Sequence, residues 1–237
     1  MVLPRTLPAA SGDAASSQLA AAVAVGSAPL VSGMPSAPDP RRAAVLMLFG
    51  PLDATPSARP AAADAVARDL DVLLLARATT LRAHAGEVAF PGGRVDPGDT
   101  DAVAAALREA REETGLDAAG VEVLGTAAPV PLAFSRHLVT PVLGWWRTPS
   151  PVRVVDEAES AAVFRATVAD LLDPANRGIT EFRREGRVWR GPAFMIDTVA
   201  GSHVVWGFTA TLLDGLFDRV GWTEPWDHER VVALPGR

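Results

Sequence analysis

Residues 86–115, with the sequence GEVAFPGGRVDPGDTDAVAAALREAREETG, restrict the fold of this chain more than any other segment. The short apolar run at its start is typical of a strand, and Pro-Gly-Gly at positions 91–93 predicts a tight turn that stops the strand. The alanine-dense stretch 101–114 predicts a helix, because acidic residues and a threonine precede it and Gly115 is placed to end it. The segment therefore predicts a strand, a turn, an aspartate-rich loop and a helix in direct succession.

The remaining apolar runs predict both strands and helices. Short strands are expected at residues 43–49, 71–76, 86–90, 121–124, 139–146 and 161–164, and a hairpin over 179–196 with its turn at Glu185-Gly186. A second helix is expected at 207–220, where one side is apolar through Leu212, Leu213, Leu216 and Phe217. The long connection 50–70 has room for a short helix of its own. Because strands and helices do not alternate regularly, we expect an α/β fold of the α+β type, with a mixed sheet covered by helices.

The length of 237 residues, of which 49% are apolar, predicts one domain with one substantial core. We place this domain at residues 41–220 and expect residues 221–237 to pack on it or trail from it. Residues 1–40 are rich in Ala, Ser and Pro, a composition that buries little apolar surface, so we expect this segment to be disordered. No apolar run approaches the ~18 residues of a membrane span, and Arg5 alone is a poor start for a signal peptide. We therefore expect a soluble, cytoplasmic protein without membrane partners.

The composition also excludes several kinds of site. The chain has no cysteine, which excludes a disulfide framework, a thiolate metal site and a cysteine nucleophile. Any metal must therefore be bound by oxygen or imidazole ligands. The formal net charge of −6 argues against nucleic-acid binding, because phosphate neutralisation needs clustered excess cations. The charge is compatible with a small anionic substrate held by a few arginines.

Three glutamates in the predicted helix, Glu109, Glu112 and Glu113, have the spacing that places side chains on one face. Considered alone, the helix favours a solvated surface on which Arg108 and Arg111 supply local ion pairs. The preceding loop reverses this preference, because its glycines can bring a backbone carbonyl beside the helix and its aspartates add further carboxylates. Oxygen ligands of this kind suit Mg²⁺ or Mn²⁺, and they predict metal-assisted attack of water on a phosphoanhydride.

The stretch GGRVDPGDTDAVAAALREAREETGL resembles the signature of the Nudix hydrolases, which is Gly, five residues, Glu, seven residues and R-E-U-x-E-E-x-G-U, where U is aliphatic. The second half matches at every fixed position: Arg108, Glu109, Ala110, Glu112, Glu113, Gly115 and Leu116. The first half departs, because Asp99 replaces the glutamate and eight residues separate it from Arg108, which puts any role of Asp99 in doubt. The resemblance implies an α/β/α sandwich. It also implies divalent-metal ligands at Glu109, Glu112, Glu113 and the Gly93 carbonyl, and Arg108 as the residue that orients a carboxylate.

Residues 73–93, LLLARATTLRAHAGEVAFPGG, resemble the second signature of the coenzyme A pyrophosphatase branch of that family. The resemblance implies that Arg77 and Arg82 contact substrate phosphates, with solvated loop charges as the alternative. His84 would contact phosphate or cap the loop. The V-T-P-V-L-G stretch at 139–144 and W-G-F-T-A at 206–210 resemble the same branch. Ser135-Arg136-His137 stands where relatives have S-G-F, which puts the acyl or pantetheine end of the pocket in doubt.

The implied reaction is hydrolysis of the diphosphate of coenzyme A or acyl-CoA, giving adenosine 3′,5′-bisphosphate and (acyl-)4′-phosphopantetheine. A carboxylate must take the proton of the attacking water, and the candidates are Glu112 on the helix and Glu159, with its neighbour Glu157, in a later loop. For the two loop residues, a solvated surface acid is the alternative. Two other functions stay open: a Nudix pyrophosphatase for ADP-ribose, a dinucleotide or a nucleoside triphosphate, and a non-catalytic ligand-sensing module. A homodimer is also possible.

Overall fold

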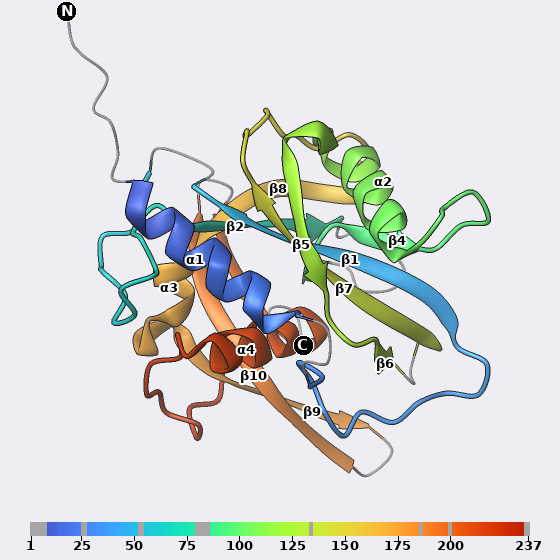
Figure 1. Cartoon of the computed structure of the whole chain (residues 1–237). Coiled ribbons are helices and arrows are strands. Elements are labelled where there is room, and N and C mark those ends of the chain that lie inside the picture. The colour runs from blue at the N-terminus through green and yellow to red at the C-terminus, as the bar shows by residue number, and fades with distance from the viewer. Residues whose placement is uncertain are drawn as a thin grey trace, which may run out of the picture.

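A mixed sheet of eight strands forms the centre of the computed structural model, which describes residues 9–24, 28–51, 55–78, 86–132, 135–184, 187–198 and 201–234 (Figure 1). Its central path has the order β3-β2-β1-β7-β5, and β4, β6 and β8 pair with β1, β7 and β2. The β1–β7 pair is parallel and the other pairs are antiparallel. The strands are β1 Arg41–Gly50, β2 Asp71–Arg77, β3 Val88–Ala89, β4 Gly92–Arg94, β5 Val121–Thr126, β6 Val130–Leu132, β7 His137–Trp146 and β8 Ser160–Thr167.

A second, antiparallel sheet and four helices complete the described structure. The second sheet has the order β11-β10-β9, with β9 Arg177–Arg184, β10 Arg187–Thr198 and β11 Gly201–Val205. The helices are α1 Ala9–Ala22, α2 Ala102–Thr114, α3 Val168–Leu172 and α4 Gly207–Val220, with single 3₁₀ turns at Ala118–Gly120 and Pro174–Asn176. Helices lie on both sides of the central sheet (Figure 1). This arrangement confirms the predicted α+β fold with a mixed sheet flanked by helices.

The two faces of β1 belong to different cores, because successive strand residues point to opposite sides. One face packs against α2 through small and branched side chains: Ala44, Leu46, Leu48, Ala105, Ala106 and Ala110. The other face packs toward α1, α4 and the second sheet, and includes Met47, Phe49, Leu19, Phe194, Leu213 and Phe217. The small alanines of α2 let this helix lie close to the sheet, which brings its glutamates to the end of β4.

The N-terminal segment differs from our expectation of a disordered segment at residues 1–40. α1 covers the face of the sheet opposite α2, and Leu19 is fully buried there. The Gln18 side chain accepts a hydrogen bond of 2.6 Å from the indole of Trp222. Arg219 of α4 donates to the backbone carbonyls of Ala22, at 3.2 Å, and of Pro29, at 2.6 Å. These contacts come from residues about 200 positions away in the chain, so composition could not reveal them.

Most predicted elements are present, with three differences. The turn at 91–93 does not stop pairing, because the chain re-enters the sheet as β4 beside β1. No helix forms in residues 55–70, the described part of the long connection. The elements β6, β11 and α3 were not predicted. The hairpin of β9 and β10 is present, although its predicted turn at 185–186 lies outside the described residues.

The C-terminal segment packs against the domain over residues 221–234. Trp222 is buried beside Phe217, and Val231 bridges to Ile179 of β9. Glu224 is also buried and accepts hydrogen bonds from the Arg59 guanidinium and from the Ala62 backbone N–H. In the part of the chain that the structure describes, no helix combines the length and the apolar character needed to cross a membrane.

Candidate active site

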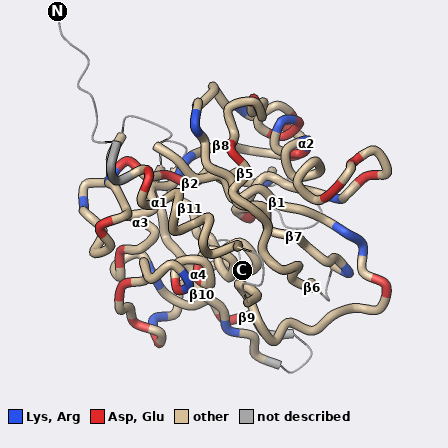
Figure 2. The backbone as a smooth tube through the Cα atoms, in the orientation of Figure 1, with Lys and Arg blue, Asp and Glu red and all other residues tan. Residues whose placement is uncertain are grey.

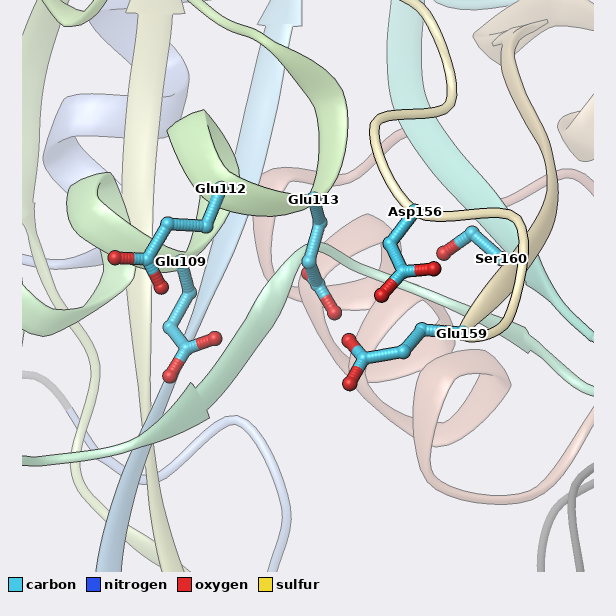
Figure 3. A pocket seen from close by; sticks show the side chains of 6 residues that line it. All are labelled: Glu109, Glu112, Glu113, Asp156, Glu159 and Ser160. Carbon is cyan, nitrogen blue, oxygen red and sulfur yellow. The ribbon is translucent and has the colours of Figure 1, made fainter.

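The glutamates of α2 form one wall of an acidic cleft. The helix begins after Asp101, whose side chain accepts a hydrogen bond from the Ala104 backbone, and ends at Gly115, which adopts a left-handed φ of 71°. Between these ends, the glutamate side chains project to the same side of the helix (Figure 3). The cleft has a volume of about 200 Å³ and is lined by Glu109, Glu112, Glu113, Asp156, Glu159 and Ser160.

The opposite wall is the loop before β8, and backbone hydrogen bonds tie this loop to the end of α2. The N–H groups of Arg153 and Val155 donate to the carbonyls of Thr114, at 2.9 Å, and Glu113, at 3.4 Å. The chain then turns at Asp156, whose carbonyl accepts from the N–H groups of Glu159 and Ser160. As a result, the carboxylates of Asp156 and Glu159 point toward that of Glu113 across the cleft (Figure 3).

The two glycines of β4 lie beside the glutamates of the helix. The Gly92 N–H donates a hydrogen bond of 2.9 Å to the Glu113 carboxylate. At Gly93, a Cβ atom would lie 2.4 Å from the carboxyl carbon of Glu109, so only glycine leaves room for this carboxylate. The Gly93 backbone therefore lies against the carboxylate of Glu109; that Gly93, Glu109, Glu112 and Glu113 together hold a metal stays a prediction.

Arg108 connects the glutamates to the loop before α2. Its guanidinium donates two hydrogen bonds of 3.0 Å to the carboxylate of Asp99, one of 3.0 Å to the Arg94 carbonyl, and one of 3.0 Å each to Glu109 and Glu112. Bidentate pairing of this kind fixes the plane of the guanidinium. The sequence left the role of Asp99 in doubt. In the structure Asp99 holds Arg108, and the extra loop residue does not prevent the contact.

The electrostatics of the cleft follow from burial and from these contacts. Burial raises the pKa of Glu113 to about 7, and the negative charges of Glu109 and Glu159 add to this effect, whereas the Gly92 N–H and the Arg77 charge oppose it. Burial also raises the pKa of Glu109 above its ordinary value. In contrast, the hydrogen bond from Arg108 holds the pKa of Asp99 below its ordinary value. The cleft thus concentrates negative charge that one external cation would stabilise.

The donor set fits a hard divalent cation, because the side chains that line the cleft offer only oxygen atoms, five carboxylates and the hydroxyl of Ser160. As placed, no three acidic or histidine side chains among the described residues converge closely enough to hold one ion. Glu109 and Glu112 are instead bonded to Arg108. An ion would have to draw these two side chains away from the guanidinium, a rotamer change that the half-exposed Glu112 permits.

The predicted substrate-binding residues are only partly described. Arg77 ends β2 opposite Ser160, and its Nε is buried without a hydrogen-bond partner in the described structure. Because Ser160 lines the cleft, its strand partner Arg77 lies at the edge of the cleft. Arg82 and His84 lie outside the described residues. Of the proposed loop acids, Glu159 lines the cleft and the exposed Glu157 does not.

The prediction missed Asp156 and Ser160. Both residues line the cleft, yet neither lies in a motif that the sequence made visible. Their position depends on the hydrogen bonds between the loop and α2, which join residues about 40 positions apart. The only signal in the sequence is that Asp156 lies three positions before Glu159, a predicted candidate base.

Comparisons with known proteins agree with the residue pattern. Residues 58–185 match the family profile described as "NUDIX domain". The chain is 36% identical over 149 residues to "Uncharacterized Nudix hydrolase NudL" of Photorhabdus laumondii, with coverage of 63% of this chain and 76% of that protein. It is 39% identical over 153 residues to the protein of the same name from Escherichia coli strain K12, with coverage of 63% and 75%. Among solved structures, a MutT/nudix family protein from Enterococcus faecalis aligns at 17% identity with a TM-score of 0.44, over 80% of this chain and 65% of that chain.

Proposed function

The chain belongs to the Nudix family, and we propose that it hydrolyses the diphosphate bond of coenzyme A or its thioesters. Nudix hydrolases in general require divalent metal ions, and we propose Mg²⁺ or Mn²⁺ here. The products would be adenosine 3′,5′-bisphosphate and (acyl-)4′-phosphopantetheine. The observation that carries the proposal is the acidic cleft between α2 and the loop before β8, with Arg77 at its edge.

The ion would be held by Glu109, Glu112, Glu113 and the Gly93 carbonyl. When bound, it would offset negative charge on the diphosphate oxygens and favour deprotonation of the attacking water. The chain's own contribution is positioning. Arg108, fixed by Asp99, donates hydrogen bonds to Glu109 and Glu112 and would orient both carboxylates before an ion binds. Phosphoryl transfer depends mainly on such positioning and on charge stabilisation.

We propose Glu159 as the residue that takes the proton from water. Its backbone is fixed on both sides, because its N–H donates to Asp156 and its carbonyl accepts from Ala78. Glu112 is the other candidate, but we propose it as a ligand of the ion, and in the structure its carboxylate accepts a hydrogen bond from Arg108. In the reaction, the water oxygen forms a bond to one phosphorus, the bridging P–O bond breaks, and the water proton passes to Glu159.

The specificity for coenzyme A rests on the motif that runs from Arg77 to Gly93. Arg77 of this motif is the strand partner of Ser160 in the cleft, and its guanidinium would donate charge-assisted hydrogen bonds to a phosphate. The last fixed positions, Gly92 and Gly93, contact the glutamates directly. The motif therefore joins substrate recognition to the proposed metal site.

The test is incubation of the protein with coenzyme A and Mg²⁺ or Mn²⁺, followed by chromatography of the products. We expect both products in equal amounts, and a loss of turnover of at least about 100-fold in Glu112→Gln. The same assay with ADP-ribose, a dinucleotide and a nucleoside triphosphate separates the substrates. Cleavage of ADP-ribose with coenzyme A left intact would refute the substrate assignment, and unchanged turnover in Glu112→Gln would remove this metal site from the mechanism.

A further inference from the structure

Four basic residues lie together where β1 and β7 begin and β4 ends: Arg41, Arg94, Arg136 and His137, here named the basic cluster. Arg41 begins β1, Arg94 ends β4 and His137 begins β7. In the sheet, Arg41 is opposite His137, and Arg94 is opposite Ala43. Directly opposed residues point to the same side, and so do residues two apart on one strand. The side chains of Arg41, Arg94 and His137 therefore share one face. The blue segment at the right-hand end of β1 in Figure 2 marks this end of the strand.

The basic cluster adjoins the acidic cleft but lies on the other face of the sheet. Ala44 packs against α2, so the odd-numbered β1 residues, including Arg41, point away from that helix. Arg94 directly follows Gly93, whose Cα is only ~3.8 Å from that of Arg94. The Arg94 carbonyl also accepts a hydrogen bond of 3.0 Å from Arg108. A ligand at the end of β4 can thus reach both the cleft and the basic cluster.

Carboxylates do not neutralise the basic cluster. Among the described residues, no Asp or Glu oxygen lies within 4.0 Å of the guanidinium groups of Arg41, Arg94 or Arg136, although the chain carries a net charge of −6. Asp39, two residues before Arg41, makes no ion pair with them. Burial lowers the pKa of His137, and the charges of Arg94 and Arg41 lower it further, which is independent support for their proximity. Unpaired cations this close repel one another unless an anion binds between them.

The backbone conformation of Arg136 also supports a ligand-binding role for the basic cluster. Its φ is 55°, in the left-handed region that favours glycine, and among the described non-glycine residues only Asp39 shares a positive φ. The Arg136 side chain is exposed, and its only described polar contact is a 3.5 Å approach to the Pro38 carbonyl. Packing therefore does not explain an arginine at this position. Its carbonyl accepts a 2.8 Å hydrogen bond from Arg41, which fixes Arg136 beside the basic cluster.

We infer that the basic cluster binds a phosphate monoester of the substrate, separate from the diphosphate that is cleaved. The inference rests on the proposed function. In coenzyme A this group is the 3′-phosphate, which is attached to the same ribose as the diphosphate and must therefore bind close to the cleft. Two guanidinium groups on one face suit a phosphate dianion, because each can donate two parallel hydrogen bonds. Arg41 and Arg94 then set the preference for a 3′-phosphorylated substrate.

The experiment compares kcat/KM for coenzyme A with kcat/KM for dephospho-coenzyme A, which lacks only the 3′-phosphate. We expect the wild-type enzyme to prefer coenzyme A. In the double variant Arg41→Gln and Arg94→Gln, we expect the ratio of the two values to fall at least about tenfold, since hydrogen bonds to charged groups contribute this much. The matched control is Arg42→Gln, which removes the same charge from the adjacent residue on the other face and should keep the ratio. A ratio that stays at the wild-type value in the double variant, or that falls equally in the control, overturns the inference.

A binding measurement tests the basic cluster independently of the proposed reaction. We expect titration calorimetry without metal to show tighter binding of adenosine 3′,5′-bisphosphate than of AMP, and this difference should disappear in the double variant. If the wild-type protein cleaved neither form of coenzyme A, the proposed function would fail, while this difference would still test the basic cluster. Inorganic phosphate is the second ligand to be titrated. The inference would be wrong if phosphate binding depended on Arg41 and Arg94 while the ratio of kcat/KM for coenzyme A and dephospho-coenzyme A did not. The basic cluster would then bind a free effector.

Discussion

Gly92 and Gly93 are neighbours in β4, but alanine at each position should affect different properties. A Cβ at Gly92 would lie 2.4 Å from the Ala44 carbonyl oxygen and 2.7 Å from the Cα of Val45. Both are backbone atoms of β1, so they cannot move without disturbing the central strand. A Cβ at Gly93 would instead meet the carboxylate of Glu109 at 2.4 Å, which is the free end of a flexible side chain.

The expected magnitudes follow from what must move. Gly92→Ala overpacks the sheet, which should lower the free energy of unfolding by about 1–3 kcal/mol and Tm by roughly 2–12 °C. Gly93→Ala should change the free energy of unfolding by less than about 1 kcal/mol, since the Glu109 side chain can swing aside. That carboxylate must move by about 1 Å to reach ordinary contact at 3.4 Å. A displacement of about 1 Å in a catalytic site can lower the rate roughly 100-fold.

The assay pairs thermal unfolding with turnover of coenzyme A and with calorimetric titration of Mn²⁺. Gly98→Ala is the control, because a Cβ there meets no atom within 4 Å. We expect wild-type values for Gly98→Ala, a lower Tm for Gly92→Ala, and weaker Mn²⁺ binding with little change in Tm for Gly93→Ala. Wild-type turnover and Mn²⁺ affinity in Gly93→Ala would refute the assignment of Gly93 and Glu109 to one site.

Three further predictions concern Asp99, Glu224 and Leu19. Asp99→Asn removes the charge that holds Arg108 and should lower kcat/KM about tenfold while Tm stays within a few degrees; a wild-type rate would contradict the positioning role. Burial raises the pKa of Glu224, but the hydrogen bonds from Arg59 and the Ala62 N–H lower it more, so its folded pKa lies below 4.5. The stabilisation by this ion pair is complete above pH 4.5 and is lost as the pH falls through the folded pKa. In urea titrations, Glu224→Gln should therefore lower the free energy of unfolding by about 2 kcal/mol at pH 7 and by less at pH 3. A loss that does not depend on pH would contradict the ion pair. Leu19→Ala should lower the free energy of unfolding by about 3 kcal/mol, whereas an unchanged midpoint in urea would show that α1 does not stabilise the domain.

The sequence predicted the elements whose signal is local. The apolar runs of β1 and β2 are continuous, and α4 has an apolar side, so both kinds of element follow from short-range patterns. α1 was missed because alanine and serine give it no apolar stripe. Its stability comes from the burial of Leu19 and from the hydrogen bond between Gln18 and Trp222. These two residues lie far apart in the sequence, so no local pattern reveals the contact. The strand β4 was missed because its glycines resemble a simple turn until the backbone of β1 is placed beside them.

In the candidate site, too, local geometry could be predicted from the sequence and contacts between distant residues could not. Glu109, Glu112 and Glu113 could be predicted to share a face, because helix geometry alone determines it. The contact between Asp99 and Arg108 could not be predicted, since an insertion of one residue can either break such a contact or be absorbed by the loop. Asp156 was missed because its position depends on backbone hydrogen bonds between the loop and α2.

The parallel pairing of β1 with β7 also affects the order in which the protein can fold during synthesis. β1 is synthesised first, and residues 51–136 must be made before its parallel partner begins at His137. At ordinary rates of translation this delay is on the order of ten seconds. During that time, a strand whose residues 46–49 are all fully buried in the native state lacks its longest partner. Chaperone binding to nascent chains of increasing length should therefore be strongest before β7 emerges and should decline once that strand is available.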